Sequence, residues 1–169
     1  MIIAEVKFDP RLAWSDGFYG GLISGAVVSV FFMVTDALLR LPIDSIYLFL
    51  ASAVLGKAAM NGGWLPVALG VGMLFLLSAF GGMFYAGIAR RWPGLAQTPV
   101  STVAGLIYGF FVWLLFVDVI VPTSGMQQTI DHPLWISAAG IGLFYGTTLC
   151  EYLANVARKR LARSQNSPS

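Results

Sequence analysis

Long apolar stretches separated by short polar segments dominate the hydrophobic pattern of the chain. Four stretches, residues 17–39, 66–89, 100–121 and 134–156, reach the ~20 residues that a helix needs to cross a bilayer core about 30 Å thick. Backbone polar groups find no water inside hydrocarbon, so each stretch is predicted to be a continuous helix that satisfies its own hydrogen bonds. The pattern therefore predicts an all-α fold, a polytopic membrane four-helix bundle.

A shorter apolar segment, residues 43–60, lies between the first two predicted spans. It follows Pro42, is polar only at Asp44, Ser45, Ser52 and Lys57, and ends at a run of Asn and Gly. Its cation and its short connectors favour an additional helix that lies in the interface on the outer face of the membrane. The alternative is that this segment also crosses the bilayer, which would give five spans.

Composition supports a membrane protein and excludes several kinds of chemistry. The 169 residues are 57% hydrophobic and 11% charged, against about 25% charged residues in soluble domains. A formal net charge of +2 with scattered cations gives no reason to expect a nucleic-acid partner. One Cys and one His cannot form a structural zinc site or a disulfide framework, so no metal and no cofactor are expected.

The positions of the cations predict the orientation of the bundle. Short cytoplasmic segments are enriched in Lys and Arg. A four-span arrangement with both termini inside leaves only Arg40 and Lys57 outside, and places the other cations on the inner side: Lys7, Arg11, Arg90, Arg91, Arg158, Lys159, Arg160 and Arg163. We therefore expect a cytoplasmic segment over residues 1–16, the bundle over residues 17–157, and a basic, frayed cytoplasmic tail over residues 158–169. The expected location is a bacterial inner membrane.

An internal repeat relates the two halves of the predicted bundle. The sequence Gly-Leu-Ile-Ser-Gly at residues 21–25 matches Gly-Leu-Ile-Tyr-Gly at residues 105–109. A second match joins residues 70–75 to residues 140–145. Two repeated helical hairpins would account for both matches, and the alternative is that Gly-rich apolar helices resemble one another by composition alone.

Glycines four residues apart mark predicted helix-packing faces. Small residues at this spacing let two helix backbones approach closely and gain dispersion contacts that lipid does not offer. These glycines are Gly17, Gly21, Gly25, Gly105, Gly109, Gly142 and Gly146. Packing within one chain is the first interpretation, and an interface for a second copy or another membrane subunit is the alternative.

Charged residues inside the predicted spans are the candidate functional residues. Asp36 and Asp118 lie near the outer ends of the first and third spans, and two carboxylates facing one cavity could hold a proton or a cation. The structural alternative pairs Asp36 with Arg40, four residues later on the same helix. Glu151 and Arg158 are predicted to form a salt bridge on the inner side.

Short motifs in three of the spans resemble a group of small bacterial four-helix integral membrane proteins whose function is uncharacterised. They are Gly63-Trp64-Leu65, the run from Ala104 to Gly109 that leads to Trp113 and Pro122, and Phe144-Tyr145-Gly146. The resemblance implies four spans and no particular activity. Members of this group often carry two histidines where this chain has Pro66 and Gly142, so any function of those histidines does not transfer.

The expected function is therefore that of a non-catalytic membrane protein. No phosphate-binding loop, nucleophile elbow or zinc-protease motif is present in the sequence. Packing glycines favour an accessory or assembly subunit whose partners are the lipid bilayer and either another membrane protein or a second copy. The alternative is a small oligomeric transporter or channel that uses Asp36 and Asp118.

Overall fold

The computed structural model describes residues 12–92, 95, 100–124 and 134–165 of the chain. Most of the predicted N-terminal segment, the loop that holds His132 and the last four residues lie outside this part of the chain. In the described part the fold is all-α, as the sequence predicts.

Two long helices, α1 (Trp14–Leu38) and α3 (Trp64–Arg91), form the first hairpin. The Asp16 side chain accepts a hydrogen bond from the backbone N–H of Ala13 at 2.7 Å, which fixes the first turn of α1. Helix α1 thus begins three residues before the predicted start, and α3 extends two residues beyond the predicted span at each end.

The segment between these helices forms α2 (Ser45–Leu55), followed by the 3₁₀ helix η1 (Gly56–Asn61). At 1.5 Å per residue, α2 is only about 16 Å long, roughly half of a bilayer core. Gly56 and Gly62 have positive φ angles, +56° and +73°, and these turn the chain away from α2 and into α3. Helix α2 packs against α3 as a short side element of the first hairpin.

The second hairpin contains two helical segments with stretches of π-helix. The first consists of α4 (Val100–Leu115), η3 (Phe116–Ile120) and α5 (Val121–Ser124). The second consists of α6 (Leu134–Ser137), η4 (Ala138–Tyr145) and α7 (Gly146–Gln165). The tail predicted to be frayed from residue 158 is helical as far as Gln165, because α7 continues through the basic residues.

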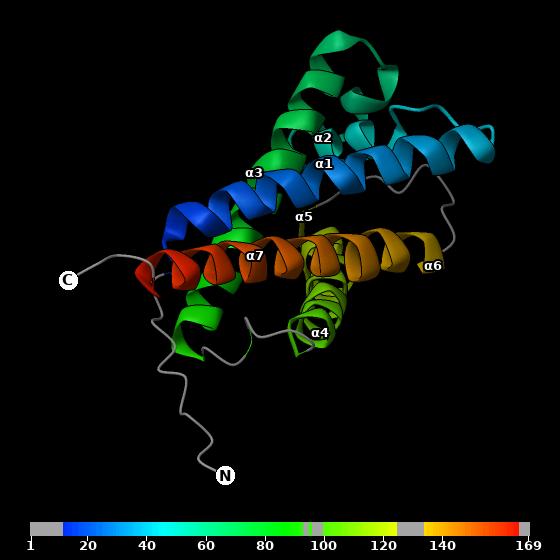
Figure 1. The fold of residues 1–169 in the computed structure, drawn as a ribbon. Coiled ribbons are helices and arrows are strands. Elements are labelled where there is room, and N and C mark those ends of the chain that lie inside the picture. Colours follow the sequence, from blue (N-terminus) through cyan, green and yellow to red (C-terminus); the bar gives the residue numbers. More distant parts are fainter. Residues whose placement is uncertain (1–11, 93–94, 96–99, 125–133, 166–169) are drawn as a thin grey trace.

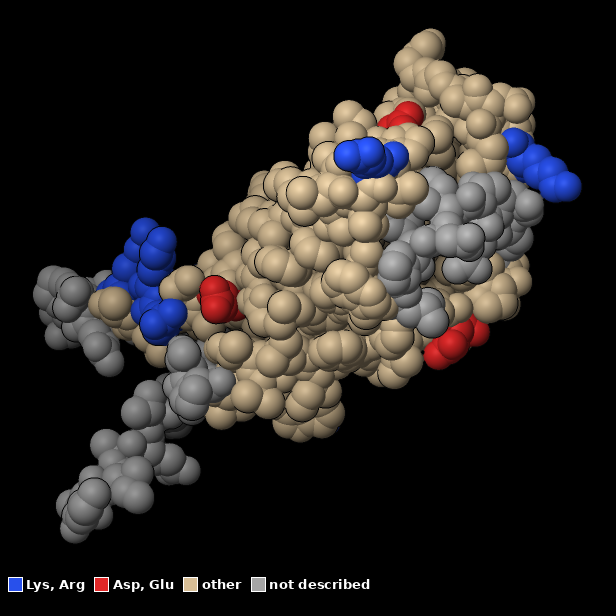
Figure 2. Space-filling model, turned by 90° about the vertical axis from the view of Figure 1, so that its right-hand side faces the viewer, with Lys and Arg blue, Asp and Glu red and all other residues tan. Residues whose placement is uncertain are grey.

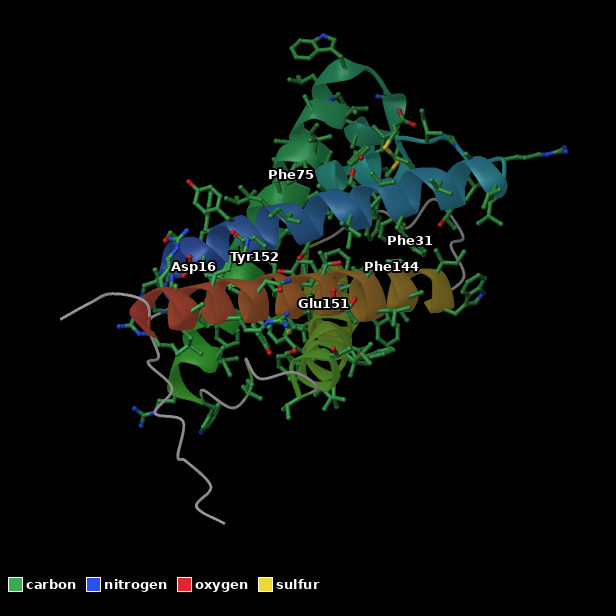
Figure 3. All side chains as sticks on the ribbon, viewed as in Figure 1. Asp16, Phe31, Phe75, Phe144, Glu151 and Tyr152 are labelled. Atoms are coloured by element: carbon green, nitrogen blue, oxygen red, sulfur yellow. The ribbon has the colours of Figure 1, made fainter. Side chains whose placement is uncertain are left out.

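The hairpins are joined along α1 and α7, which lie side by side and run in opposite directions (Figure 1). Helix α3 crosses behind α1, and α4 packs against η4 and α7. Phe31 of α1 and Phe144 of η4 stack between the hairpins with ring centroids 4.7 Å apart. Figure 3 shows these two rings between the helices.

Glycine brings the backbones together inside each hairpin. A Cβ atom on Gly17 would lie 2.5 Å from the carbonyl oxygen of Gly82, and one on Gly105 would lie 2.6 Å from that of Gly146. Both are shorter than the contacts that real Cβ atoms make. The matching motifs at residues 21–25 and 105–109 thus occupy corresponding places, each against the other helix of its own hairpin.

The other predicted packing glycines follow the same rule. Gly21 and Gly25 face Ser78 of α3, Gly109 faces the backbone of Gly142, and Gly142 faces the ring of Phe110. Glycine faces are therefore used within one chain. What remains on the outside of the helices is largely bulky apolar side chains, among them Val30, Leu76 and Ile107.

Within the described residues, three helices are long and apolar enough to cross a membrane: Trp14–Leu38, Trp64–Arg91 and the continuous helical segment Val100–Thr123. Charged side chains lie mainly toward the ends of the molecule. On the face shown in Figure 2, a broad surface without charge separates a group of Lys and Arg from the charged residues toward the other end.

Replacing Gly21 by alanine should destabilise the first hairpin. The added methyl would meet the backbone at Ser78, and overpacking of this kind costs about 1–3 kcal/mol because the helices must move apart. Thermal unfolding in detergent measures the change. Gly72→Ala is the matched control, because nothing lies within 4 Å of its Cβ position and alanine is the better helix former. Equal stability of the two variants would contradict the close contact.

Candidate functional site

Two tyrosines of the second hairpin are hydrogen-bonded to the backbone of α3. Tyr108 donates to the carbonyl oxygen of Gly81 at 2.6 Å, and Tyr145 donates to that of Ser78 at 2.7 Å. Both side chains are buried. A buried phenol needs an acceptor, and a carbonyl of a neighbouring helix is the available one in an apolar core. These bonds fasten the two hairpins together.

Tyr85 and Cys150 complete this core cluster. The rings of Tyr85 and Tyr108 have centroids 4.8 Å apart, and Cys150 is 1% exposed beside the Gly105 contact. Sequence reasoning did not identify the tyrosines. For Tyr108 and Tyr145 the available signal was a phenol inside an apolar span, which usually has a hydrogen-bond partner, but that partner lies on a helix distant in sequence.

Asp36 is fully buried where α2 returns against α1. The hydroxyl of Ser45, at the first residue of α2, donates a hydrogen bond to the Asp36 carboxylate. The Ser29 and Tyr47 hydroxyls form a second hydrogen bond between the same two helices. The sequence-based pairing of Asp36 with Arg40 places the carboxylate on the surface, whereas its exposed fraction is 0% and Arg40 is exposed beyond the end of α1.

Asp118 lies in a different environment from Asp36. It belongs to the π-helical segment η3, and its side chain is exposed. Asp36 is buried and bonded to Ser45, whereas Asp118 is exposed on η3, and neither lines the central cavity described next. A shared ion site of the two carboxylates stays a prediction.

A half-open cavity of about 90 Å³, the central cavity, lies between the two hairpins and α2. Its lining is almost entirely apolar, and neither aspartate contributes to it. The lining residues come from both hairpins and α2: Val28, Phe32, Ile46, Leu50, Leu74, Leu77, Ser78, Val112, Phe116, Ile141 and Tyr145. The two π-helical segments border it through Phe116 and Ile141. A space with this lining suits a hydrocarbon group better than a hydrated ion.

The predicted salt bridge between Glu151 and Arg158 is replaced by other contacts. Arg158 donates to the side-chain oxygen of Asn155 at 2.7 Å, and Glu151 is exposed on α7 (Figure 3). The ion pair that joins the hairpins in the described residues is instead between Arg160 and Asp16, at 2.7 Å. The helix continues past residue 158, so Arg160 reaches the first turn of α1.

These features define the class of the protein as an all-α protein of two glycine-packed hairpins, with helices long and apolar enough to cross a membrane. No protein-family model, curated protein or solved structure matches the chain. In the described residues, no group of three or more His, Cys, Asp or Glu side chains could hold a metal ion.

Asp36 and Asp118 should respond differently to substitution. Asp36→Ala removes the acceptor of the buried Ser45 hydroxyl and should lower the free energy of unfolding by about 1–3 kcal/mol. Asp118→Ala changes an exposed side chain and should alter it by less than about 0.5 kcal/mol. Thermal unfolding of both variants in the same detergent measures the difference. A stable Asp36→Ala protein would contradict the role of Asp36 in holding α2.

Proposed function

We propose that the chain is a non-catalytic integral membrane protein that acts as an accessory subunit, through contacts of its outer surface with another membrane protein or a second copy. The observation that carries this proposal is that the interior of the bundle serves helix packing. Buried polar side chains fasten helices to one another, glycines pack within the hairpins, and the central cavity is apolar. The outer surface is what remains for function.

Four membrane crossings with both termini in the bacterial cytoplasm complete the proposal. The length and apolar character of α1, α3 and α4 support it. The antiparallel course of α7 beside α1 supports a fourth crossing, and the short length of α2 favours a position in the interface. Arg90 and Arg91 end α3, and Arg160 contacts the start of α1. This basic end is assigned to the inner side by the distribution of cations.

The transporter alternative needs a polar route through the bundle. Its strongest support is the burial of Asp36, because an ionisable group within a membrane protein often marks an ion pathway. The exposed position of Asp118 and the apolar lining of the central cavity weigh against a shared ion site. The geometry therefore favours the accessory subunit.

Cysteine labelling tests the orientation. Lys57 of η1 and Arg163 near the end of α7 are exposed, and each can be replaced by Cys in a Cys150→Ser background. A membrane-impermeant maleimide should label the cysteine at position 57 in intact spheroplasts, and the one at position 163 only after the membrane is opened. Labelling of both positions in intact spheroplasts would contradict the proposed topology.

Photo-crosslinking in intact cells tests the accessory role. A photoreactive amino acid is placed at Val30 on α1, Leu76 on α3 or Ile107 on α4, all of them exposed, and at Leu50 as a buried control. At least one exposed position should give a discrete crosslinked product, either the chain joined to one partner protein or a dimer at twice the chain mass. Leu50 should give no crosslinked product. Monomer alone from all three exposed positions would contradict the proposal.

A further inference from the structure

An open groove of about 450 Å³ lies at the basic end of the first hairpin. It is formed by the start of α1 and the last two turns of α3: Trp14, Phe84, Gly87, Ile88, Arg90, Arg91 and Trp92. Gly87 allows the ring of Trp14 to lie against α3, because a Cβ atom there would be 3.0 Å from the ring. The two tryptophans remain 55% and 63% exposed, so their faces are available to a ligand.

Arg90 and Arg91 carry the positive charge of this groove. In the described residues, neither Arg90 nor Arg91 forms an ion pair with a carboxylate. The nearby acidic residue of α1, Asp16, is already engaged by Arg160 and by the N–H of Ala13. Two exposed guanidinium groups that line one groove therefore attract an anion, and a phosphate matches the hydrogen-bonding geometry of a guanidinium.

The rest of the groove is apolar and follows one face of α3. Phe84, Ile88 and Arg91 are separated by four and three residues, so they lie on the same side of the helix. The face changes from aromatic to basic over about 10 Å, at 1.5 Å per residue. A phospholipid changes from acyl chain to phosphate in the same direction when α3 ends at the membrane surface.

We propose that this groove binds an anionic phospholipid, with the phosphate held by Arg90 and Arg91 and the upper acyl chain against Phe84, Ile88 and Trp14. A free phosphate would use the arginines and leave the apolar lining uncovered, so the groove favours the lipid. Basic pockets on the cytoplasmic side of membrane helices commonly bind acidic headgroups, and Trp is frequent at this depth. The inference rests on the membrane placement proposed above and is independent of any protein partner.

Lipid binding to the purified, delipidated full chain tests this site. Dioleoyl phosphatidylglycerol and dioleoyl phosphatidylcholine are titrated separately, and bound lipid is counted by native mass spectrometry. The wild type should bind the anionic phosphatidylglycerol at least tenfold more tightly than the zwitterionic phosphatidylcholine. The double variant Arg90→Gln/Arg91→Gln should reduce this preference for the anionic lipid at least tenfold. Arg158→Gln/Lys159→Gln removes the same charge from the same end outside the groove, and should retain binding within twofold.

Two further arms separate the sources of phosphate and guard against misfolding. Phe84→Ala should weaken lipid binding at least threefold, whereas displacement of the lipid by millimolar inorganic phosphate would show a free-anion site and overturn the proposal. Arg91→Gln alone, an exposed single change, should weaken binding at least threefold if the double variant does not fold. Equal loss in the Arg158/Lys159 control, or equal binding of both lipids, would also overturn it.

Extraction of membranes with alkaline carbonate distinguishes failure of this site from failure of the proposed membrane placement. Chain released with the soluble fraction would contradict the placement itself. Chain that stays in the membrane and still shows no preference for the anionic lipid would contradict only the lipid site.

Discussion

Close approach of helix backbones at glycine is the constraint on which the rest of this structure depends. In each hairpin, carbonyl oxygens of one helix lie where a Cβ atom of the other would otherwise stand, as at Gly17 and Gly105. Lipid competes equally well for apolar side chains, so helix association in a membrane needs this gain in close packing. Once the hairpins are formed, Tyr108 and Tyr145 come within hydrogen-bonding distance of α3 and join them.

The same constraint assigns roles to the polar residues. Hydroxyl groups of Ser45, Tyr108 and Tyr145 all reach acceptors within the chain: Ser45 joins α2 to α1, and the two tyrosines join the second hairpin to α3. Asp36 therefore belongs to the packing of α2 against α1. The side chains that remain available to bind a partner or a ligand lie on the outside, in apolar helix faces and in the groove with Arg90 and Arg91.

Sequence periodicity predicts the helices and the small-residue faces because both are local properties of the chain. The partner of each face is not local: spacing identifies Gly105, but the Gly146 backbone that it meets is 41 residues away in the sequence. Asp36 was misplaced for the same reason, since its burial depends on the turn that returns Ser45 to α1. The groove was also missed, because Trp14 and Arg91 each suit a membrane boundary alone and only the hairpin places them together.

A disulfide between Gly105→Cys and the native Cys150 is the most direct measurement of glycine packing within one chain. The Cβ position of residue 105 lies 2.9 Å from the Cβ of Cys150, so a small separation of the helices reaches the roughly 3.5–4.5 Å that a disulfide needs. Mild oxidation in native membranes should give a linked peptide at monomer mass in most of the protein. Two free thiols, or a disulfide-linked dimer, would contradict the account.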